Sequence, residues 1–218
     1  MTCHIELKNL ALSFSWKTYH KQIFHDLNLC IQRGSYVTIT GTNGSGKSSL
    51  IKLLLGLIPP DQGEIIIQGE AVRSGYPEAV RKGRISYLSQ QIEDLFFADT
   101  VKEELTQTHL SRPSGINTKY LQSLGLAEHL HRSILSLSGG ERQALALAQF
   151  MGNESNLLIL DEPSSYLDQE RAEVLRDYLH DAHFSGKTIL HITQYPAEVQ
   201  WGTHFIDLNQ SDVKVVEL

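Results

Sequence analysis

Eight consecutive residues, Gly41 to Ser48, have types and spacing that could hold a phosphate group. They match the pattern G-x-x-x-x-G-K-[ST] in full. In this pattern the glycines let backbone N–H groups curl round an anion, Lys47 brings a positive charge to the β- and γ-phosphates, and the Ser48 hydroxyl is a ligand for Mg²⁺. The sequence therefore predicts a nucleotide-phosphate site made by Gly41, Asn43, Gly44, Ser45, Gly46, Lys47, Ser48 and Ser49.

Two neighbouring acids, Asp161 and Glu162, follow the apolar run Leu157 to Leu160, whose length suits a buried parallel strand. We expect Asp161 to be an outer ligand of Mg²⁺, usually through water. We expect Glu162 to polarise the attacking water as a general base. Taken alone, the pair would more often be ordinary acids that cap a following helix. The predicted phosphate-binding segment Gly41 to Ser48, which we call the phosphate cradle, is what favours the catalytic interpretation.

The elements that must position these residues alternate between strands and helices, which favours an α/β architecture. Tyr36 to Thr40 is a β-branched strand directly before the cradle, and Ser48 to Leu57 has leucines at helical spacing directly after it. Between Gln90 and about Met151 the pattern becomes helical and more polar, which indicates an inserted helical lobe. Further strands are expected at His4 to Leu10, Glu64 to Gln68, Ile85 to Leu88 and Thr188 to Thr193, and an amphipathic helix at Gln169 to His183.

The composition excludes several classes of protein. The chain has 218 residues, of which 41% are hydrophobic and 20% charged, so it is neither disordered nor fibrous. Its net charge of −6 argues against a nucleic-acid binder. The most apolar window, Leu50 to Ile58, is shorter than the about 20 residues that span a bilayer, and the start shows no secretory signal. We therefore expect a soluble chain.

Cysteine and histidine give little support for other sites. The only cysteines, Cys3 and Cys30, are expected to be inert thiols, and their small number is typical of a reducing compartment. The ten histidines have no acidic or cysteine partners at ligand spacing, so we expect no metal site on them.

The stretch Leu137 to Gln143, LSGGERQ, resembles the signature motif of the ATP-binding cassette (ABC) ATPases. The resemblance covers nearly the whole chain and includes Pro60 to Glu64, Gln90, and Ser165 to Asp168. It implies a single ABC domain over residues 1–218, built on a P-loop NTPase core with a mainly parallel sheet. It also implies an N-terminal antiparallel β subdomain and a helical signature subdomain inserted at 91–151.

The resemblance implies that the signature motif binds ATP in a second subunit. Two subunits would pack head to tail, so that Ser138, Gly139 and Gly140 of each contact the γ-phosphate held by the cradle of the other. Ser138 can also cap the helix that is expected to begin near Glu141, and the two glycines leave room for backbone amides to approach an oxyanion.

Other residues acquire roles only through this resemblance. Gln90 would be a Mg²⁺ contact at the hinge between the core and the helical lobe, and Asp168 would belong to the nucleotide site. Trp16 falls where the family usually places an aromatic side chain that stacks on adenine. Tyr19 is a competing candidate for that stack.

One position departs from the family pattern. In the family, a strand ends in a Thr-His pair whose histidine contacts the γ-phosphate, whereas this chain has Thr193 followed by Gln194. His191 lies three residues earlier and cannot be moved into place without breaking the alternation of the strand. Glutamine keeps an N–H donor but cannot become a cation or relay a proton. We therefore expect ATP binding with slow hydrolysis, although Gln194 could also substitute well enough.

The resemblance implies an ATPase subunit that powers a membrane transporter from the cytoplasmic face of the cell (inner) membrane. ATP and Mg²⁺ would be its cofactors, and its partners would be a transmembrane permease subunit and a second ABC subunit, identical or similar. Gln91 to Val101 resembles the coupling region of importers of the cobalt and vitamin (energy-coupling-factor) type. Two alternatives remain: a soluble ABC ATPase, which usually has a coiled-coil insertion or two cassettes, and a regulatory subunit that binds ATP with little hydrolysis.

Overall fold

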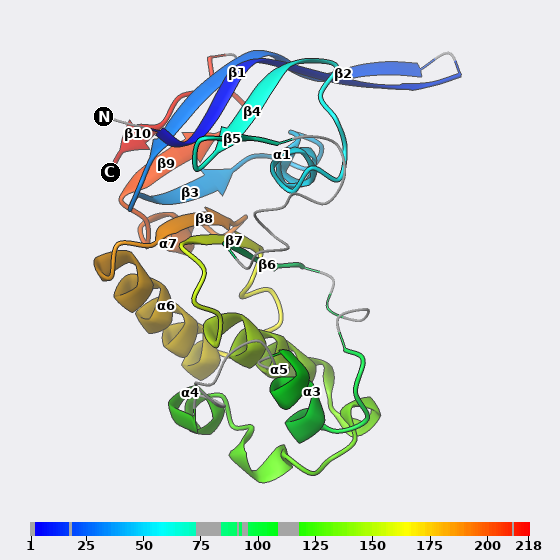
Figure 1. Cartoon of the computed structure of the whole chain (residues 1–218), viewed down its shortest axis with the longest axis vertical. Helices are drawn as coiled ribbons and strands as arrows, with labels where there is room; N and C mark the ends of the chain where they lie inside the picture. The colour runs from blue at the N-terminus through cyan, green and yellow to red at the C-terminus, as the bar shows by residue number, and fades with distance from the viewer. Residues whose placement is uncertain are drawn as a thin grey trace.

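A computed structural model describes residues 3–17, 19–72, 84–90, 92, 96–108, 118–210 and 212–218. It contains two sheets with helices between and beneath them (Figure 1). The upper sheet is antiparallel, with the strand order β2-β1-β4-β5. Its strands are β1 (Cys3–Trp16), β2 (Tyr19–Gln32), β4 (Gln62–Ile67) and β5 (Glu70–Ala71).

The lower sheet is mainly parallel and has the order β10-β9-β3-β8-β7-β6, in which β10 alone pairs antiparallel. Its central strands are buried on both faces, as expected for a parallel sheet covered by helices. The strands are β3 (Tyr36–Thr40), β6 (Ile85–Leu88), β7 (Leu157–Asp161), β8 (Thr188–Ile192), β9 (His204–Asp207) and β10 (Val216–Glu217).

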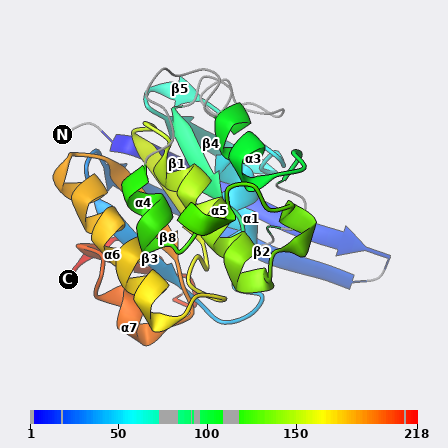
Figure 2. The same cartoon turned by 90° about the horizontal axis from the view of Figure 1, so that it is seen from below.

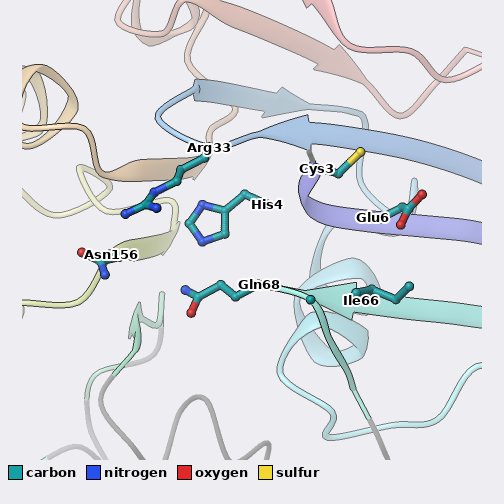
Figure 3. Close-up of a pocket in the computed structure, with 8 residues that line it drawn as sticks. Cys3, His4, Glu6, Arg33, Ile66, Gln68 and Asn156 are labelled. Atoms are coloured by element: carbon teal, nitrogen blue, oxygen red, sulfur yellow. The ribbon is translucent and has the colours of Figure 1, made fainter. Parts of the chain in front are cut away.

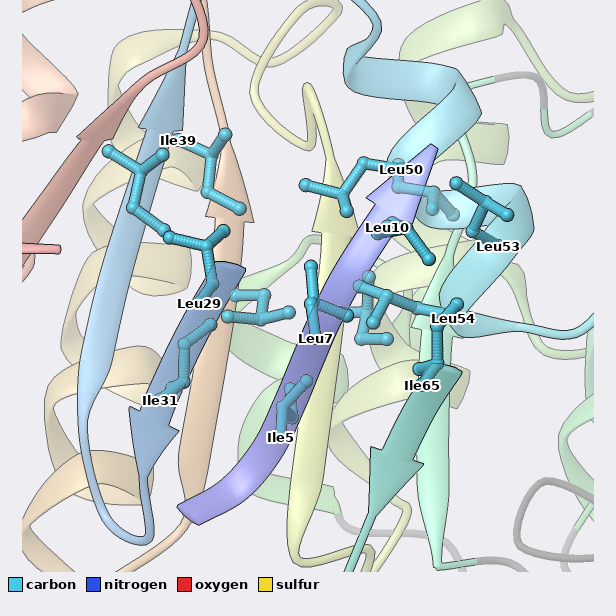
Figure 4. Close-up of a cluster of buried hydrophobic side chains, with 14 of the residues drawn as sticks. Ile5, Leu7, Leu10, Leu29, Ile31, Ile39, Leu50, Leu53, Leu54 and Ile65 are labelled. Carbon is cyan, nitrogen blue, oxygen red and sulfur yellow. The ribbon is translucent and has the colours of Figure 1, made fainter. Parts of the chain in front are cut away.

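Two hydrophobic clusters hold these layers together. One fills the space between the two sheets and α1 (Lys47–Leu54), as Figure 4 shows. The other joins the lower sheet to α5 (Gly139–Met151) and α6 (Gln169–Phe184). Seen from below, α5, α6 and α4 (Thr118–Ser123) lie over the lower sheet, beside α3 (Val101–Thr108) (Figure 2). The layers confirm the predicted α/β class with its antiparallel subdomain and helices.

Most predicted elements are present, but several boundaries differ. The helix after the cradle ends at Leu54, not at Leu57, because Gly56 has a φ of 61° and the Leu57 N–H donates to the Lys52 carbonyl, which closes the helix. The first strand extends to Trp16, beyond the predicted Leu10. A bulge at Asn9, with a φ of 48°, shifts the alternation of buried residues by one position. Strands β2, β5, β9 and β10 were not predicted.

The prediction of inert thiols was wrong, because Cys3 and Cys30 form a disulfide. They are 27 residues apart in sequence, but β1 and β2 pair antiparallel and bring their Cα atoms to 5.4 Å. This is a usual separation for bridged cysteines. The cysteines therefore no longer indicate a reducing compartment. Within the described residues, no helix has the length and apolar character needed to cross a bilayer.

Candidate nucleotide site

The predicted phosphate cradle joins the end of β3 to the start of α1. Gly46 begins the helix with a φ of 105°, and a Cβ atom there would lie 2.7 Å from Ile23 Cγ2 and 2.8 Å from Phe24 Cζ. Only glycine fits this position. The first turn of α1 has no capping side chain and no acidic residue, so its free N–H groups and partial positive charge are available to an anion.

Two side chains of the cradle have the chemistry that an oxyanion site needs. The buried Lys47 ammonium donates to the carbonyl of Gly41 at 2.6 Å and to that of Thr42 at 3.3 Å. The Ser45 hydroxyl oxygen is buried and has no hydrogen-bond partner in the part of the chain that the structure describes. A buried polar atom without a partner is costly, and a phosphate oxygen would satisfy it.

The two predicted acids lie at the end of β7. Asp161 is its last residue, Glu162 follows it, and each is 8% exposed. Burial, and next the neighbouring carboxylate of Glu162, raise the pKa of Asp161 to about 6, while Lys47 opposes this shift. Two buried acids with one nearby ammonium leave negative charge that a cation would compensate.

Glu162 is held by two glutamines from distant parts of the sequence. Gln90 Nε2 donates to Glu162 Oε2 at 2.9 Å, and Gln194 Nε2 donates to the same oxygen at 3.1 Å. The backbone of Glu162 has a φ of 48°, a conformation uncommon for this residue type, and its N–H donates to the Ile192 carbonyl at 2.9 Å. The carboxylate is thus oriented by two amide groups at the end of the parallel sheet.

These residues share one cavity of about 530 Å³. Nine of its lining residues were predicted from the sequence: Asn43, Gly44, Gly46, Lys47, Ser48, Ser49, Gln90, Glu162 and Gln194. Ser45 and Asp161 each adjoin a lining residue in the chain, and Gly41 lies two positions before Asn43, but these three do not line the cavity. The cradle, the two glutamines and the Glu162 carboxylate therefore share one cavity although up to 151 positions (43 to 194) separate them in sequence.

The cavity has three lining residues that the sequence analysis missed: Phe14, Lys21 and Ile23. Lys21 Nζ donates to the carbonyl of Gly44 at 2.9 Å. Lys21 and Ile23 lie on β2, which was not predicted. Phe14 lies two positions before Trp16 on β1, so period-two spacing could have indicated it. The side chains of Trp16 and Tyr19 lie outside the described residues.

The predicted signature residues do not line this cavity. Ser138 accepts a hydrogen bond from the Glu141 N–H at 3.3 Å, and the Glu141 carboxylate accepts one from the Ser138 N–H at 2.7 Å. This capping box confirms the predicted cap, although the helix begins at Gly139. A Cβ atom on Gly139 would meet nothing within 4 Å. Asp168 caps α6 instead, because it accepts from the Arg171 N–H at 2.9 Å.

His191 lies inside β8, as predicted, and has partners of its own. Its Nδ1 is 3.1 Å from the Tyr36 hydroxyl, and its Nε2 is 3.2 Å from Glu198. Thr193 and Ser164 also donate to the Glu198 carboxylate. Burial alone would raise the pKa of Glu198, but the hydrogen bonds from His191, Ser164 and Thr193 together lower it. This buried network lies beside the site, whereas the neighbouring Gln194 lines the cavity.

Comparison with known proteins finds ATP-binding relatives, which agrees with a nucleotide site at this cavity. The family described as ABC transporter matches residues 24–165. An energy-coupling factor transporter ATP-binding protein, EcfA1 of Fusobacterium nucleatum, is 31% identical over 216 residues, which are 96% of this chain and 80% of the relative. A zinc transport system ATP-binding protein, AdcC of Streptococcus pneumoniae, is 32% identical and covers 84% of this chain and 81% of its own length.

Solved structures show the same fold. A dimeric ATP-binding cassette, MJ0796, in a post-hydrolysis state bound to ADP and Pi superposes with a TM-score of 0.80 at 22% identity, covering 97% of this chain and 96% of its own. The chain belongs to the ABC transporter family. It is an ATP-binding subunit of an ABC transporter, an ATPase whose hydrolysis of ATP powers transport.

Proposed function

We propose that this subunit works as one half of a two-subunit clamp, which ATP binding closes and hydrolysis opens. The observation that carries the proposal is that the signature residues lie outside the nucleotide cavity of their own chain. Ser138, Gly139 and Gly140 begin a capped helix with open space at Gly139, yet they line no part of the cavity that contains Lys47. The N-terminus of a second helix can bind a phosphate, and this one could bind the nucleotide if it faced the cradle of another subunit. The fold it shares with dimeric cassettes also supports this arrangement.

Mg²⁺ would be held between the cradle and the acids. The oxygen donors available are the Ser48 hydroxyl, the Gln90 amide and the Asp161 carboxylate, together with phosphate oxygens of the nucleotide. This donor set suits Mg²⁺, which usually takes one or two carboxylates and keeps several waters. The raised pKa of the buried Asp161 also fits a cation at this point. When bound, the ion would neutralise charge that develops on the phosphates.

The chain's own residues would bind the phosphates, accept the proton and position the catalytic carboxylate. Lys47 and the N–H groups of α1 bind and orient the phosphates, and Glu162 accepts the proton of the attacking water. Gln90 and Gln194 hold the Glu162 carboxylate in place through their N–H groups. Phe14, 47% exposed on the cavity wall, joins Trp16 and Tyr19 as a candidate for the adenine stack.

Hydrolysis would be slow because Gln194 stands where the family has the histidine that contacts the γ-phosphate. Gln194 supplies an N–H donor that holds Glu162, but no positive charge for the phosphoryl group as it is transferred. The same residue would suit a regulatory subunit that binds ATP and leaves hydrolysis to a partner. The chain retains Glu162, which two hydrogen bonds orient, and this favours a subunit that hydrolyses ATP over one that only binds it.

The membrane partner would be a separate permease subunit, contacted through the helical lobe proposed at 91–151 of a single ABC domain. Resemblance to energy-coupling factor ATP-binding proteins over 96% of the chain supports an importer of that type. The segment that resembles their coupling region lies partly outside the described residues, but Phe97 is described and is 87% exposed. The subunit would then sit on the cytoplasmic face of the inner membrane, paired with an identical or a similar subunit.

Closure of the clamp is tested by measuring the molar mass of the protein in solution, which distinguishes a monomer from a dimer. Glu162→Gln protein with ATP and Mg²⁺ is expected to form a dimer in light scattering, and the additional change Ser138→Arg is expected to abolish it. The matched control is Gln122→Arg, which places the same side chain on the exposed face of α4. A monomer under all conditions, or a dimer that tolerates Ser138→Arg, would refute closure through the signature motif in a homodimer.

A further inference from the structure

A second cavity lies at the opposite end of the lower sheet, away from the nucleotide site. We call this cavity of about 640 Å³ the basal pocket, and its polar lining includes His4, Arg33, Gln68 and Asn156. Arg33 precedes β3 and Asn156 precedes β7, whereas the cradle and Glu162 follow the same two strands. The strands are parallel, so the two cavities are separated by the length of five residues, about 16 Å.

The polar heads of these four side chains converge on one space (Figure 3). Arg33 makes no ion pair within the described part of the chain, and the Asn156 side chain has no hydrogen bond there. Gln68 Nε2 is buried and lacks a partner. The Gln68 N–H donates to the His4 carbonyl at 2.8 Å, which fixes the end of β4 against β1. Three donor groups are thus without a described acceptor.

The hydrogen bonding of His4 makes it a further donor. Its Nδ1 pairs with the hydroxyl of Thr188, which already accepts from the Gly34 N–H at 2.9 Å. Among the described residues, His4 Nδ1 is the only acceptor for the Thr188 hydroxyl proton, so the hydroxyl donates to Nδ1 and the ring proton is on Nε2. Burial, and next the charge of Arg33, lower the pKa of His4, so the ring stays neutral near pH 7.

We propose that the basal pocket binds a small organic anion, whose carboxylate or phosphate group is held by Arg33, His4 Nε2, Gln68 Nε2 and Asn156. A guanidinium and three neutral N–H donors directed at one point suit an oxyanion, which needs several donors and one balancing charge. The volume is that of a small-molecule site. Ile66 gives the pocket an apolar wall, and Glu6, the acid among the lining residues that the structure describes, is already paired with Lys8 at 3.2 Å.

The proposal is tested by NMR of the ¹⁵N-labelled full chain, titrated separately with inorganic phosphate and with citrate in the absence of Mg²⁺. The imidazole resonance of His4, assigned from His4→Gln, is expected to shift in a saturable way. A phosphate in the nucleotide cavity cannot cause this shift, because that cavity lies at the far end of the strands. A response to phosphate alone, to citrate alone or to both supports the site and identifies the anion class.

Variants decide whether the contacts are those proposed. Arg33→Gln is expected to weaken binding at least about tenfold, the usual consequence of losing one hydrogen bond to a charged group. Arg33 is exposed, so the variant should fold normally. The control Arg176→Gln removes an exposed arginine from α6 and should change nothing. The proposal is overturned if His4 shows no saturable shift with either anion, or if Arg33→Gln binds as well as the unaltered chain.

Discussion

Gln194→His is the substitution that most directly tests the chemistry proposed for this site. Gln194 Nε2 lies 3.1 Å from Glu162 Oε2 and lines the nucleotide cavity. An imidazole at this position keeps an N–H donor and adds the ability to carry a positive charge. Because Gln90 still donates to Glu162 at 2.9 Å, the general base should remain in place.

The expected gain follows from the contact that the histidine restores. One preorganised donor to the transition state contributes roughly 2–4 kcal/mol, or about 30- to 900-fold in rate. Gln194→Leu should have the opposite effect. It removes one of the two hydrogen bonds to a charged carboxylate, which costs about 1.5–3 kcal/mol, or roughly 10- to 150-fold.

The assay is steady-state phosphate release by the purified chain at saturating ATP and Mg²⁺. Glu162→Gln supplies the background rate, and nucleotide affinity measured in parallel shows whether each variant is folded. Gln200→His is the matched control, since it makes the same change on an exposed residue at the end of α7 (Pro196–Val199). If Gln194→His is no faster than the unaltered chain, glutamine is not what limits hydrolysis, and the reasoning from its missing charge is refuted.

Three further substitutions test other parts of the structure. Lys47→Ala should lower ATP affinity by roughly 10- to 150-fold in calorimetry, because it removes a charged donor to the phosphates; unchanged affinity would contradict the cradle. Gly46→Ala should abolish ATP binding, because its Cβ would meet Ile23 and Phe24 within 3 Å, whereas Gly186→Ala, with similar φ and open space, should not. Glu198→Ala should destabilise the fold by about 3–5 kcal/mol, measured by urea denaturation against the exposed Glu128→Ala. Against the effect of burial, the hydrogen bonds from His191, Ser164 and Thr193 lower the pKa of Glu198, so the stability that its charge contributes is present above its ordinary value of 4.5 and is lost as pH falls through the lowered native value; the difference between variant and unaltered chain should therefore shrink as the pH is lowered below 4.5.

The parts of the site that the sequence predicted are those set by local spacing. Gly41 to Gly46 form the loop between β3 and α1, Lys47 and Ser48 begin the helix, and Ser138 caps the start of α5. These features depend on the residue types at neighbouring positions, including the glycines that allow unusual backbone conformations. They can therefore be predicted from the local sequence. Phe14, Lys21 and Ile23 escaped the prediction because their position depends on how β1 and β2 pair.

The disulfide and the support of Glu162 illustrate the same limit. Cys3 and Cys30 are 27 positions apart, and only the pairing of β1 with β2 brings them within bonding distance. Resemblance indicated Gln90 and Gln194 separately, but nothing in the sequence showed that both donate to one oxygen of Glu162.

By itself, the sequence determined the phosphate cradle, the family of the chain and the order of most strands and helices, because these depend on residue type and on spacing over a few positions. Only the tertiary structure decided which distant side chains share a cavity. It placed Gln90, Glu162 and Gln194 together at one end of the lower sheet, and Arg33, Gln68 and Asn156 at the other. The physical reason is that parallel strands align the ends of distant segments, and the register between strands is set by packing rather than by local sequence.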